Sequence, residues 1–562
     1  MPRIGVFICH CGTNIAGTVD VARVAEEIRK YPGVACALDY KYMCSDPGQS
    51  IIRQAIHEEK LDGIVVAACS PAMHEATFRR TAGEAGLNPY RCEIANIREQ
   101  CSWVHEGDRE VATQKAVELI RSIVEKVVRD EALTPLHLPL TRRALVIGGG
   151  IAGLTAALEI AEAGYPVILV EREKALGGNM ARLSGIYLNF DSAQDLLRDR
   201  IEAVQNHPNI EVLTETEVGE LSGYVGNFRA RMRPSGAEYE IGAIIVATGY
   251  SLYPKERLGE YGGGRIPDVV DGLQFEKMLK EGIRRPSDGR LPRQVAFVQC
   301  AGSRDPALHM PYCSKVCCMY VAKGAIAYKK QVPEGRAYVF YIDIRSQGKG
   351  YEEFVQQAVE KYGVLYLRGK VSRIFREGDE MVVWGADTLS GEALEVRADL
   401  VVLATAAVPA PGAKELARAL RIATDEHGFF SEAHPKLRPV ESLTAGIFLA
   451  GACHFPKDIP ETVAQAEGAA AKVLSLFARE EMTQEPTVAW VEEELCSGCG
   501  LCVSACPYEA RAMHPWKRLA TVNAALCQGC GACAVACPNK ASKVRNFAAD
   551  QVLAMVETLL GH

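Results

Sequence analysis

The sequence lacks a long hydrophobic run. No stretch approaches the ~18 consecutive apolar residues of a membrane-spanning helix, and the apolar opening "IGVFIC" is interrupted by His10 and Cys11 before it could serve as a signal peptide. We therefore expect a cytoplasmic protein with no direct membrane span. Apolar residues form 48% of the 562 residues, which is typical of a globular protein, and this length predicts roughly three or four domains.

A block of basic residues is also missing. The formal net charge of -7 is spread along the chain, so nucleic acid and anionic lipid are poor candidate partners. What the sequence has in excess is cysteine, with 20 residues. Because the cytosol keeps thiols reduced, these cysteines are better explained as metal ligands or redox groups than as structural disulfides.

Strand-like and helix-like segments alternate through most of the chain, which predicts an α/β fold with parallel sheets. "ALVIGG" and "QVAFVQ" each begin a nucleotide-domain-like unit, so the middle should hold two linked Rossmann-like halves. The expected parts are an α/β domain at 1–135, a double Rossmann domain at 142–482 with its second half at about 291–408, a cysteine-rich α+β domain at 488–545, and a helix at 546–562. The apolar side of that last helix is expected to pack on its own chain rather than on a partner: Val552, Leu553, Val556, Leu559 and Leu560.

Near the C-terminus, C-x2-C-x2-C-x3-C-P occurs twice. In such motifs three thiolates hold one four-iron cluster, while the fourth reaches the other cluster. The first expected ligand set is Cys496, Cys499, Cys502 and Cys537. The second is Cys527, Cys530, Cys533 and Cys506. A zinc ribbon is the alternative, but the duplicated third and fourth cysteines favour two clusters and hence one-electron transfer.

A glycine fingerprint follows the strand "ALVIGG". Gly148, Gly150 and Gly153 open a helix together with Ile151 and Ala152, and missing side chains there let the backbone approach a pyrophosphate at the helix N-terminus. About twenty residues further on, a strand ends at Glu171 and Arg172, where the carboxylate can accept hydrogen bonds from ribose hydroxyls. The pattern predicts a dinucleotide site without distinguishing FAD from NAD.

Three further segments resemble the flavin-contacting segments of disulfide oxidoreductases of the thioredoxin reductase type, and so favour FAD. They are "GGNM", "AIIVATGY" and "GIFLAGACHFPKDIPETVAQAEGAAAKV". The residues carried over are Gly178, Asn179, Ala247, Thr248, Gly249, Gly451, and Gln465 and Ala466 at a helix start. Ala452 and Cys453 stand where that family usually has an aspartate for the ribityl chain.

The second Rossmann-like half lacks its own glycine fingerprint. The strand "QVAFVQ" runs into Cys300, with only Gly302 remaining of a glycine pattern. Pro311 is expected to open a helix that carries three cysteines on its first turns, Cys313, Cys317 and Cys318. With Cys300 these thiols could hold a third four-iron cluster, and the alternative is a redox disulfide between two of them, including the vicinal pair.

Dispersed cysteines also follow the strand-like runs of the N-terminal part. Cys9, Cys44, Cys69 and Cys101 lie at or just past the ends of such runs, and these ends share one edge of a parallel sheet. A fourth cluster is plausible there, with Cys11 as a competing or supporting ligand, against the alternative of unconnected buried cysteines. No role is assigned to Cys36, Cys92 or Cys453.

Over essentially its whole length, the chain resembles the A subunit of heterodisulfide reductase. The resemblance rests on "CHCGTNIAG", "AACSPAMHE", "NIREQCSWVH", "GGGIAG", "QCAGSRD" with "YCSKVCC", and the two C-terminal motifs. It implies a thioredoxin-reductase-like double Rossmann flavoprotein with an N-terminal cluster domain and a C-terminal two-cluster ferredoxin domain. The FAD of this family is understood to bifurcate electrons between a disulfide-type acceptor and ferredoxin. Lys457 lies in a segment that the family places near the flavin, where it could stabilise an anionic flavin; an exposed salt-bridging lysine is the alternative.

The resemblance also implies partners. These are B- and C-like subunits that hold the substrate chemistry, an electron-input subunit such as a hydrogenase or formate dehydrogenase, and ferredoxin, in a homodimer of heteromers. The sequence departs from longer family members because one C-x2-C-x2-C-x3-C-P pair is present and an inserted second ferredoxin domain is missing. Two rival functions stay open: an NAD(P)H-dependent flavin oxidoreductase like the small subunit of glutamate synthase, and a quinone-linked relay that splits no electrons.

Overall fold

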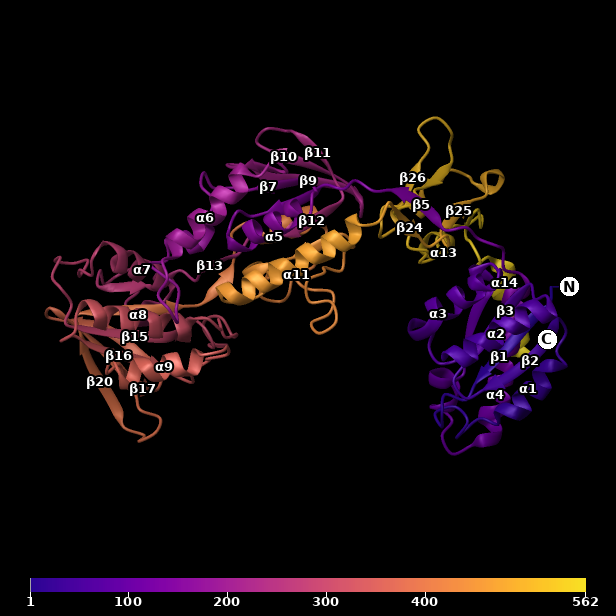
Figure 1. The fold of residues 1–562 in the computed structure, drawn as a ribbon, viewed down its shortest axis with the longest axis horizontal. Coiled ribbons are helices and arrows are strands. Elements are labelled where there is room, and N and C mark those ends of the chain that lie inside the picture. The colour runs from indigo at the N-terminus through magenta and orange to yellow at the C-terminus, as the bar shows by residue number, and fades with distance from the viewer. Residues whose placement is uncertain (1, 562) are drawn as a thin grey trace. The chain divides into compact units, whose positions relative to one another are not determined.

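The computed structural model describes residues 2–561 and divides the chain into two compact units. One contains Met1–Leu138 together with Met482–His562, and the other contains Pro139–Glu481. Figure 1 shows the elements of each unit. The chain passes between the units at β5 (Leu136–Pro139) and β24 (Glu481–Gln484). None of the helices in the described range is both long enough and apolar enough to span a membrane.

The N-terminal part of the first unit is a four-stranded, fully parallel sheet in the order β2-β1-β3-β4. Buried strands such as "IGVFIC" and "GIVVAA" form its centre, and continuous apolar runs of this kind are typical of a sheet covered on both faces. The strands are β1 (Ile4–Cys9), β2 (Val34–Tyr40), β3 (Gly63–Ala68) and β4 (Cys92–Asn96), and the helices are α1 (Val21–Arg29), α2 (Asp46–Glu59), α3 (Pro71–Glu84) and α4 (Arg109–Val128).

The C-terminal part of this unit is a small domain with two antiparallel strand pairs, β25-β28 and β26-β27. Two one-turn helices follow the glycines of the two cysteine motifs. The elements are β25 (Ala489–Val491), α12 (Leu501–Ser504), β26 (Arg511–Met513), β27 (Ala520–Val522), α13 (Ala532–Val535), β28 (Ser542–Val544) and α14 (Ala549–Leu560).

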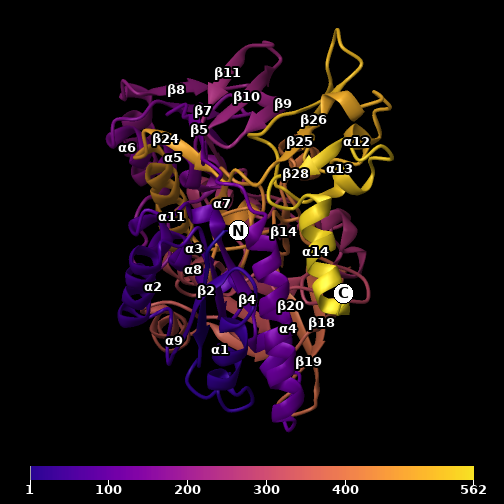
Figure 2. The same ribbon diagram turned by 90° about the vertical axis from the view of Figure 1, so that its right-hand side faces the viewer.

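Helix α14 packs beside α4 of the same unit (Figure 2), but its apolar side is exposed. Gln551 and Ala554 are its buried residues, and the Gln551 amide donates to the buried carboxylate of Asp130, which also pairs with Lys126. This polar contact orients the helix so that the predicted packing stripe faces outward, with Leu553 57% exposed. The expectation that the stripe packs on the chain is therefore wrong.

The first half of the second unit is a five-stranded parallel sheet in the order β23-β12-β6-β7-β8. Helices α5 and α11 pack against each other, and α5 also contacts α6 (Figure 1). The elements are β6 (Ala144–Ile147), α5 (Ile151–Glu162), β7 (Val167–Val170), α6 (Ala193–Asn206), β8 (Ile210–Leu213), β9 (Glu217–Tyr224), β10 (Asn227–Arg233), β11 (Glu238–Ile241), β12 (Ala243–Val246), α10 (Ala413–Leu420), β23 (Ile447–Leu449) and α11 (Ile459–Phe477).

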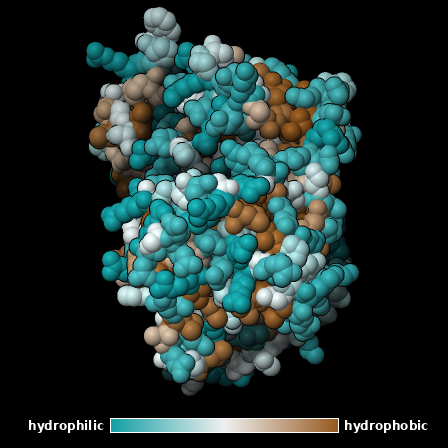
Figure 3. Space-filling model, turned by 90° about the vertical axis from the view of Figure 1, so that its left-hand side faces the viewer, coloured by the Kyte–Doolittle hydropathy of each residue, from teal (hydrophilic) through white to brown (hydrophobic). Residues whose placement is uncertain are grey.

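The second half repeats this architecture with a parallel sheet in the order β14-β21-β15-β16-β17. The expectation of two linked Rossmann-like halves is thus confirmed, and the short pair β13-β22 joins them. The elements are β13 (Tyr250–Leu252), β14 (Val269–Asp271), α7 (Gly272–Glu281), β15 (Gln294–Ala301), α8 (Cys317–Gln331), β16 (Arg336–Tyr341), α9 (Tyr351–Glu360), β17 (Leu365–Arg368), β18 (Val371–Glu377), β19 (Glu380–Ala386), β20 (Ala393–Ala398), β21 (Leu400–Thr405) and β22 (Ala407–Pro409). On the face drawn in Figure 3, apolar areas are interleaved with hydrophilic ones.

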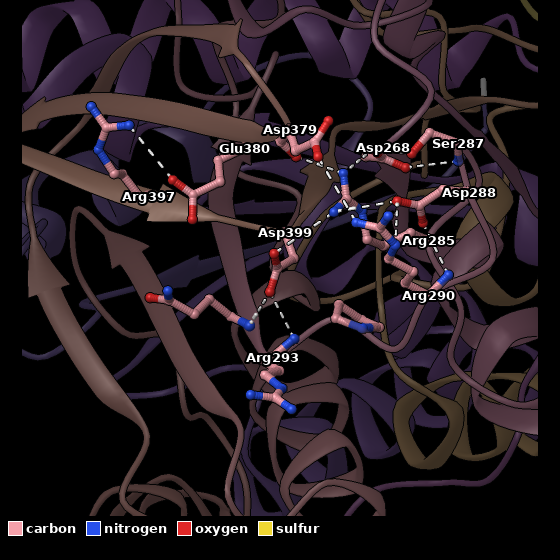
Figure 4. Close-up of polar contacts among 12 residues, drawn as sticks. Asp268, Arg285, Ser287, Asp288, Arg290, Arg293, Asp379, Glu380, Arg397 and Asp399 are labelled. Atoms are coloured by element: carbon pink, nitrogen blue, oxygen red, sulfur yellow. Dashed lines mark hydrogen bonds and ion pairs between the residues drawn. The ribbon is translucent and has the colours of Figure 1, made fainter.

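A buried charge network ties the outer elements of this second half together (Figure 4). The Arg285 guanidinium, 5% exposed, donates to the fully buried Asp268 carboxylate at 3.2 Å and to the Asp379 carbonyl at 2.6 Å. Ser287 satisfies the same carboxylate through its N–H and hydroxyl. Because the Arg285 charge is paired with carboxylates, this centre holds the loops before β14, β15 and β19 in place.

Candidate functional site

A cavity of about 520 Å³ lies at the carboxyl ends of the first parallel sheet. The turn between β6 and α5 forms one wall, and its glycines are there for different reasons. A Cβ on Gly153 would lie 1.8 Å from the Gly148 carbonyl oxygen, so Gly153 permits close packing of the helix on the strand. A Cβ on Gly150 would meet nothing within 4 Å and would instead project into open space. Open space beside an uncapped helix N-terminus fits a bound pyrophosphate.

Glu171 stands at the end of β7 and lines the same cavity. Its carboxylate accepts hydrogen bonds from the N–H of Gly149 at 2.7 Å and of Glu173 at 2.8 Å. A carboxylate has about four acceptor sites, so it can still accept ribose hydroxyls. Arg172, which donates to the Pro411 carbonyl at 2.8 Å, also lines the cavity.

Further expected residues that line the cavity come from two separate segments next to this turn. They are Gly178, Asn179, Ala247, Thr248 and Gly249. Asn179 donates to the Tyr250 carbonyl at 2.8 Å, whereas the buried Thr248 hydroxyl has no hydrogen-bond partner. An orphaned hydroxyl facing a cavity is the mark of a group that a ligand satisfies. The cavity therefore fits a dinucleotide such as FAD.

Four of the expected cofactor residues do not line the cavity. They are Gly153, Gly451, Gln465 and Ala466. Helix α11 begins at Ile459, not at Gln465, because Asp458 caps it and accepts from the Glu461 N–H. Gln465 instead accepts from the Gly451 N–H at 2.9 Å, and Ala466 is fully buried in the core. The residues that meet the cavity here are Ala452, Asp458, Ile459 and Thr462.

Lys457 lines the cavity and is not an exposed salt-bridging lysine. Its ammonium donates to the carbonyls of Gly451 at 2.9 Å and Phe455 at 3.0 Å, and lies 3.4 Å from Nδ1 of His454. The other ring nitrogen of His454 is 2.7 Å from Glu432. Burial lowers the pKa of Lys457 to about 8. All three ammonium protons are engaged, so the group acts as a fixed charge beside the cavity.

A second buried lysine was missed from the sequence. Lys323 of α8, 3% exposed, forms an ion pair with Glu276 of α7 and donates to the Gly185 carbonyl. Glu276 lines the cavity. Burial lowers the pKa of Lys323, and Glu276 opposes that shift. The available signal was a lone lysine within the apolar helix "CCMYVAKGAIAY", which is unusual for a side chain that is almost never buried unpaired.

The four central cysteines converge at the end of β15 and the start of α8. Cys300, Cys317 and Cys318 are at most 4% exposed. Mutual hydrogen bonding lowers the pKa of the Cys318 thiol to about 7 and also lowers the pKa of Cys300, while it raises the pKa of Cys317. Cys313 acts electrostatically on the same group, and its sulfur accepts from the Lys315 N–H at 3.3 Å. Lowered thiol pKa values favour thiolates, the form that binds iron.

The helix after Pro311 begins later than expected. Residues 311–316 form a loop, and α8 starts at Cys317. Tertiary hydrogen bonds hold this loop open, since the Ser314 hydroxyl accepts from the Ala407 N–H at 2.9 Å, and Lys315 has a φ of 59° that no regular helix allows. Cys313 therefore does not share a helix face with Cys317, but the loop still brings it to the other three.

Side chains fill the space beside Gly302, where the second Rossmann-like half would have its glycine-rich loop. A Cβ on Gly302 would lie 3.0 Å from the Tyr253 ring and 3.2 Å from Leu258. In a nucleotide-binding loop this side of the glycine is where the pyrophosphate approaches the backbone. Here the tyrosine ring occupies it, which disfavours a nicotinamide dinucleotide on the second half.

The C-terminal cysteines surround two separate small cavities. One is lined by Cys496, Cys499, Cys502 and Cys537, and the other by Cys506, Cys527, Cys530 and Cys533. The fourth cysteine of each motif thus crosses to the other motif. Four thiols around each cavity, with the fourth cysteines exchanged, is the ligand arrangement of a two-cluster iron-sulfur domain.

The N-terminal cysteines gather at one sheet edge, with one substitution. Cys9, Cys11, Cys44 and Cys69 act electrostatically on one another, and the Cys9 sulfur accepts from the Cys11 N–H at 3.3 Å. Cys101 follows β4 but is fully buried, and its thiol donates to the Ala112 carbonyl of α4 at 3.1 Å. The structure therefore replaces Cys101 in this group by Cys11, whose sulfur accepts from Arg98 at 3.4 Å.

Comparison with known proteins matches both cofactor regions. Residues 142–281 match the family model described as pyridine nucleotide-disulphide oxidoreductase, and residues 495–541 match the 4Fe-4S dicluster domain. The second of two iron-sulfur A subunits of CoB–CoM heterodisulfide reductase in Methanopyrus kandleri is 41% identical, with 91% of each chain covered. The A subunit of the H(2):CoB-CoM heterodisulfide,ferredoxin reductase of Methanothermobacter thermautotrophicus is 39% identical over 100% of this chain and 97% of its own. That alignment spans 645 positions against 562 residues here, so the relative has segments without a counterpart. Among solved structures, T. acidophilum thioredoxin reductase covers 60% of this chain and 100% of its own at 17% identity, with a TM-score of 0.42.

Proposed function

This chain belongs to the family of heterodisulfide reductase A subunits, and we propose that it is the electron-bifurcating subunit of a heterodisulfide-reductase-like complex. It is an oxidoreductase subunit with a flavoprotein domain and a 4Fe-4S dicluster domain. In the proposed complex it links a two-electron donor to ferredoxin and to a disulfide-type acceptor. FAD supplies the exchange between electron pairs and single electrons.

The start of helix α8 is the observation that carries this proposal. Val316 and Tyr320 line the flavin cavity, while Cys317 and Cys318 between them belong to the central cysteine group. A cluster held by Cys300, Cys313, Cys317 and Cys318 would lie next to the flavin. We assign this cluster as the nearest electron-transfer partner of the flavin. It occupies the half where a two-nucleotide reductase would hold its nicotinamide cofactor.

The proposal includes four [4Fe-4S] clusters, one for each cysteine group. Two belong to the C-terminal domain, one to the centre, and one to the N-terminal sheet edge with Cys9, Cys11, Cys44 and Cys69 as its ligands. Arg98 beside Cys11 offsets part of the negative charge of that site. The ammonium of Lys457 similarly favours negative charge in the flavin cavity.

The names of relatives indicate the partners. One relative is the A subunit of the H(2)/formate:CoB-CoM heterodisulfide,ferredoxin reductase of Methanococcus maripaludis, and another is that of the ferredoxin/F(420)H(2)-dependent CoB-CoM heterodisulfide reductase of Methanosarcina acetivorans. We extend this to B- and C-like subunits, ferredoxin, and a hydrogenase- or formate-dehydrogenase-like input subunit, in a homodimer of heteromers. Disulfide chemistry would reside in the B- and C-like subunits.

Bifurcation is tested on the complex purified anaerobically from its host. With its electron donor present, we expect ferredoxin reduction only when the disulfide is also supplied, with one electron pair to each acceptor. A complex that reduces the disulfide and never ferredoxin would be a relay that splits no electrons. Ferredoxin reduction at the same rate without disulfide would equally contradict the proposal, because the two half-reactions would not be coupled.

A further inference from the structure

Arg511 lies between the two C-terminal cysteine cavities and lines both of them. It begins strand β26 and is only 4% exposed. Its motif neighbours Tyr508 and Ala510 line one cavity, and its partner Ser542 lines the other. A single side chain therefore contributes to the walls of both proposed cluster sites.

The guanidinium of Arg511 has almost no partners within the protein. Nη2 donates to the Ser542 hydroxyl, while Nε and Nη1 are buried and have no hydrogen-bond acceptor. Across residues 2–561, no carboxylate forms an ion pair with it. A buried cation without counter-charge is strongly unfavourable, so something not supplied by side chains must compensate it.

The clusters supply the missing charge. A [4Fe-4S] cube with four thiolates is an anion whose negative charge grows by one on reduction, and its sulfurs accept hydrogen bonds. Cys502, an expected ligand of the first cluster, lies within interaction range of the Arg511 guanidinium. The donors without partners thus lie where acceptors would appear once both clusters are present.

We propose that Arg511 is a shared tuning residue that donates N–H···S hydrogen bonds to both C-terminal clusters and holds their reduction potentials close together. This inference rests on the proposed two-cluster assignment. The positive charge stabilises each reduced cluster more than the oxidised one, so it raises both potentials. Reduction of one cluster would also strengthen the hydrogen bonds between that cluster and the guanidinium. Because the same guanidinium serves both clusters, this couples their two redox equilibria.

A purely structural arginine would tie β26 to β28 through Ser542 and nothing more. That role predicts a change in domain stability without a change in cluster potential. A redox titration therefore separates the two explanations. The readout is the EPR spectrum of the pair, because two adjacent reduced clusters interact magnetically and differ from the isolated clusters elsewhere in the full chain.

The test compares the full-length wild type with Arg511→Met, with iron content confirming that the clusters assemble. We expect the equilibrium constant for reduction of each cluster to fall at least tenfold in Arg511→Met. For a one-electron couple this lowers the reduction potential of each cluster by about 59 mV. Arg518→Met is the matched control, since it removes the same charge from an exposed site of the same domain. Its effect should be small because exposed charges are screened.

Equal potentials in Arg511→Met and wild type, or a shift no larger than that of Arg518→Met, would overturn the proposal. If Arg511→Met fails to assemble clusters, Arg511→Lys decides. The single ammonium group of the lysine cannot reach both cavities, so the reduction potentials of the two clusters should move apart. Unchanged potentials in this variant would again overturn the proposal. A wild-type protein whose EPR spectrum shows no magnetically coupled pair of clusters would contradict the cluster assignment itself. That result is distinct from a coupled pair whose reduction potentials do not change in the variant.

Discussion

We expect iron content to fall from about sixteen to about twelve atoms per FAD when Cys317 and Cys318 are both replaced by alanine, because the proposed four clusters would become three. These two thiols belong to the central group, and neither is replaceable by a neighbour, because Cys300 and Cys313 are already ligands of the same proposed cluster. Loss of two ligands removes the whole cube. The measurement is anaerobic iron and flavin quantitation of the purified chain.

The matched control for this double variant is Cys453→Ala. Cys453 is a buried cysteine of the same unit, but its thiol faces the carbonyls of Val246 and Ala450 rather than other cysteines. It should keep the wild-type iron content. If the double variant also kept all its iron, the central cysteines would form a redox disulfide site instead of a cluster.

We expect FAD affinity to fall about 100-fold, or about 2.7 kcal/mol, in Gly153→Ala. The added methyl would lie 1.8 Å from the Gly148 carbonyl oxygen and 3.3 Å from Val146. Helix α5 must therefore move away from β6, and the helix N-terminus that would hold the pyrophosphate moves with it. The measurement is calorimetric titration of FAD into the flavin-free chain, supported by flavin retention on gel filtration.

Gly468→Ala provides the comparison, because this glycine lies within helix α11 and its new methyl would come no closer than 3.7 Å to Val440. Alanine is also a better helix former than glycine, so FAD affinity should stay at the wild-type value. Unchanged affinity in Gly153→Ala as well would show that FAD does not bind at this glycine loop.

Features with a local cause were predictable from the sequence. The ends of the parallel strands, the two Rossmann-like halves and the exchange of fourth cysteines between the C-terminal motifs all follow from short-range patterns, namely apolar runs, glycine turns and motif spacing. The eleven expected cofactor residues that do line the flavin cavity, from Gly148 to Gly249, belong to such turns or directly follow strands.

Features with a tertiary cause were not predictable. Proline, as at position 311, is common at helix starts, yet the Ser314 hydroxyl accepts a hydrogen bond from the Ala407 N–H of a distant strand, which holds the loop open. Cys101 follows a strand like the other cysteines, but the packing of α4 turns its thiol away. The outward stripe of α14 depends on the buried contact between Gln551 and Asp130. The position of Arg511 between the two cysteine cavities was also not predictable, because it depends on the packing of both cysteine motifs around β26.

The central claim is that electrons reach this flavin through iron and sulfur and not as hydride from a bound nicotinamide. Its most direct test is anaerobic reduction of the isolated, FAD- and iron-loaded chain, followed by flavin absorbance. Excess NADH or NADPH should leave the flavin oxidised, because the Tyr253 ring fills the space beside Gly302, while a low-potential one-electron donor such as reduced methyl viologen should bleach clusters and flavin together. Complete flavin bleaching by NADH or NADPH would contradict the account and restore the NAD(P)H-dependent oxidoreductase.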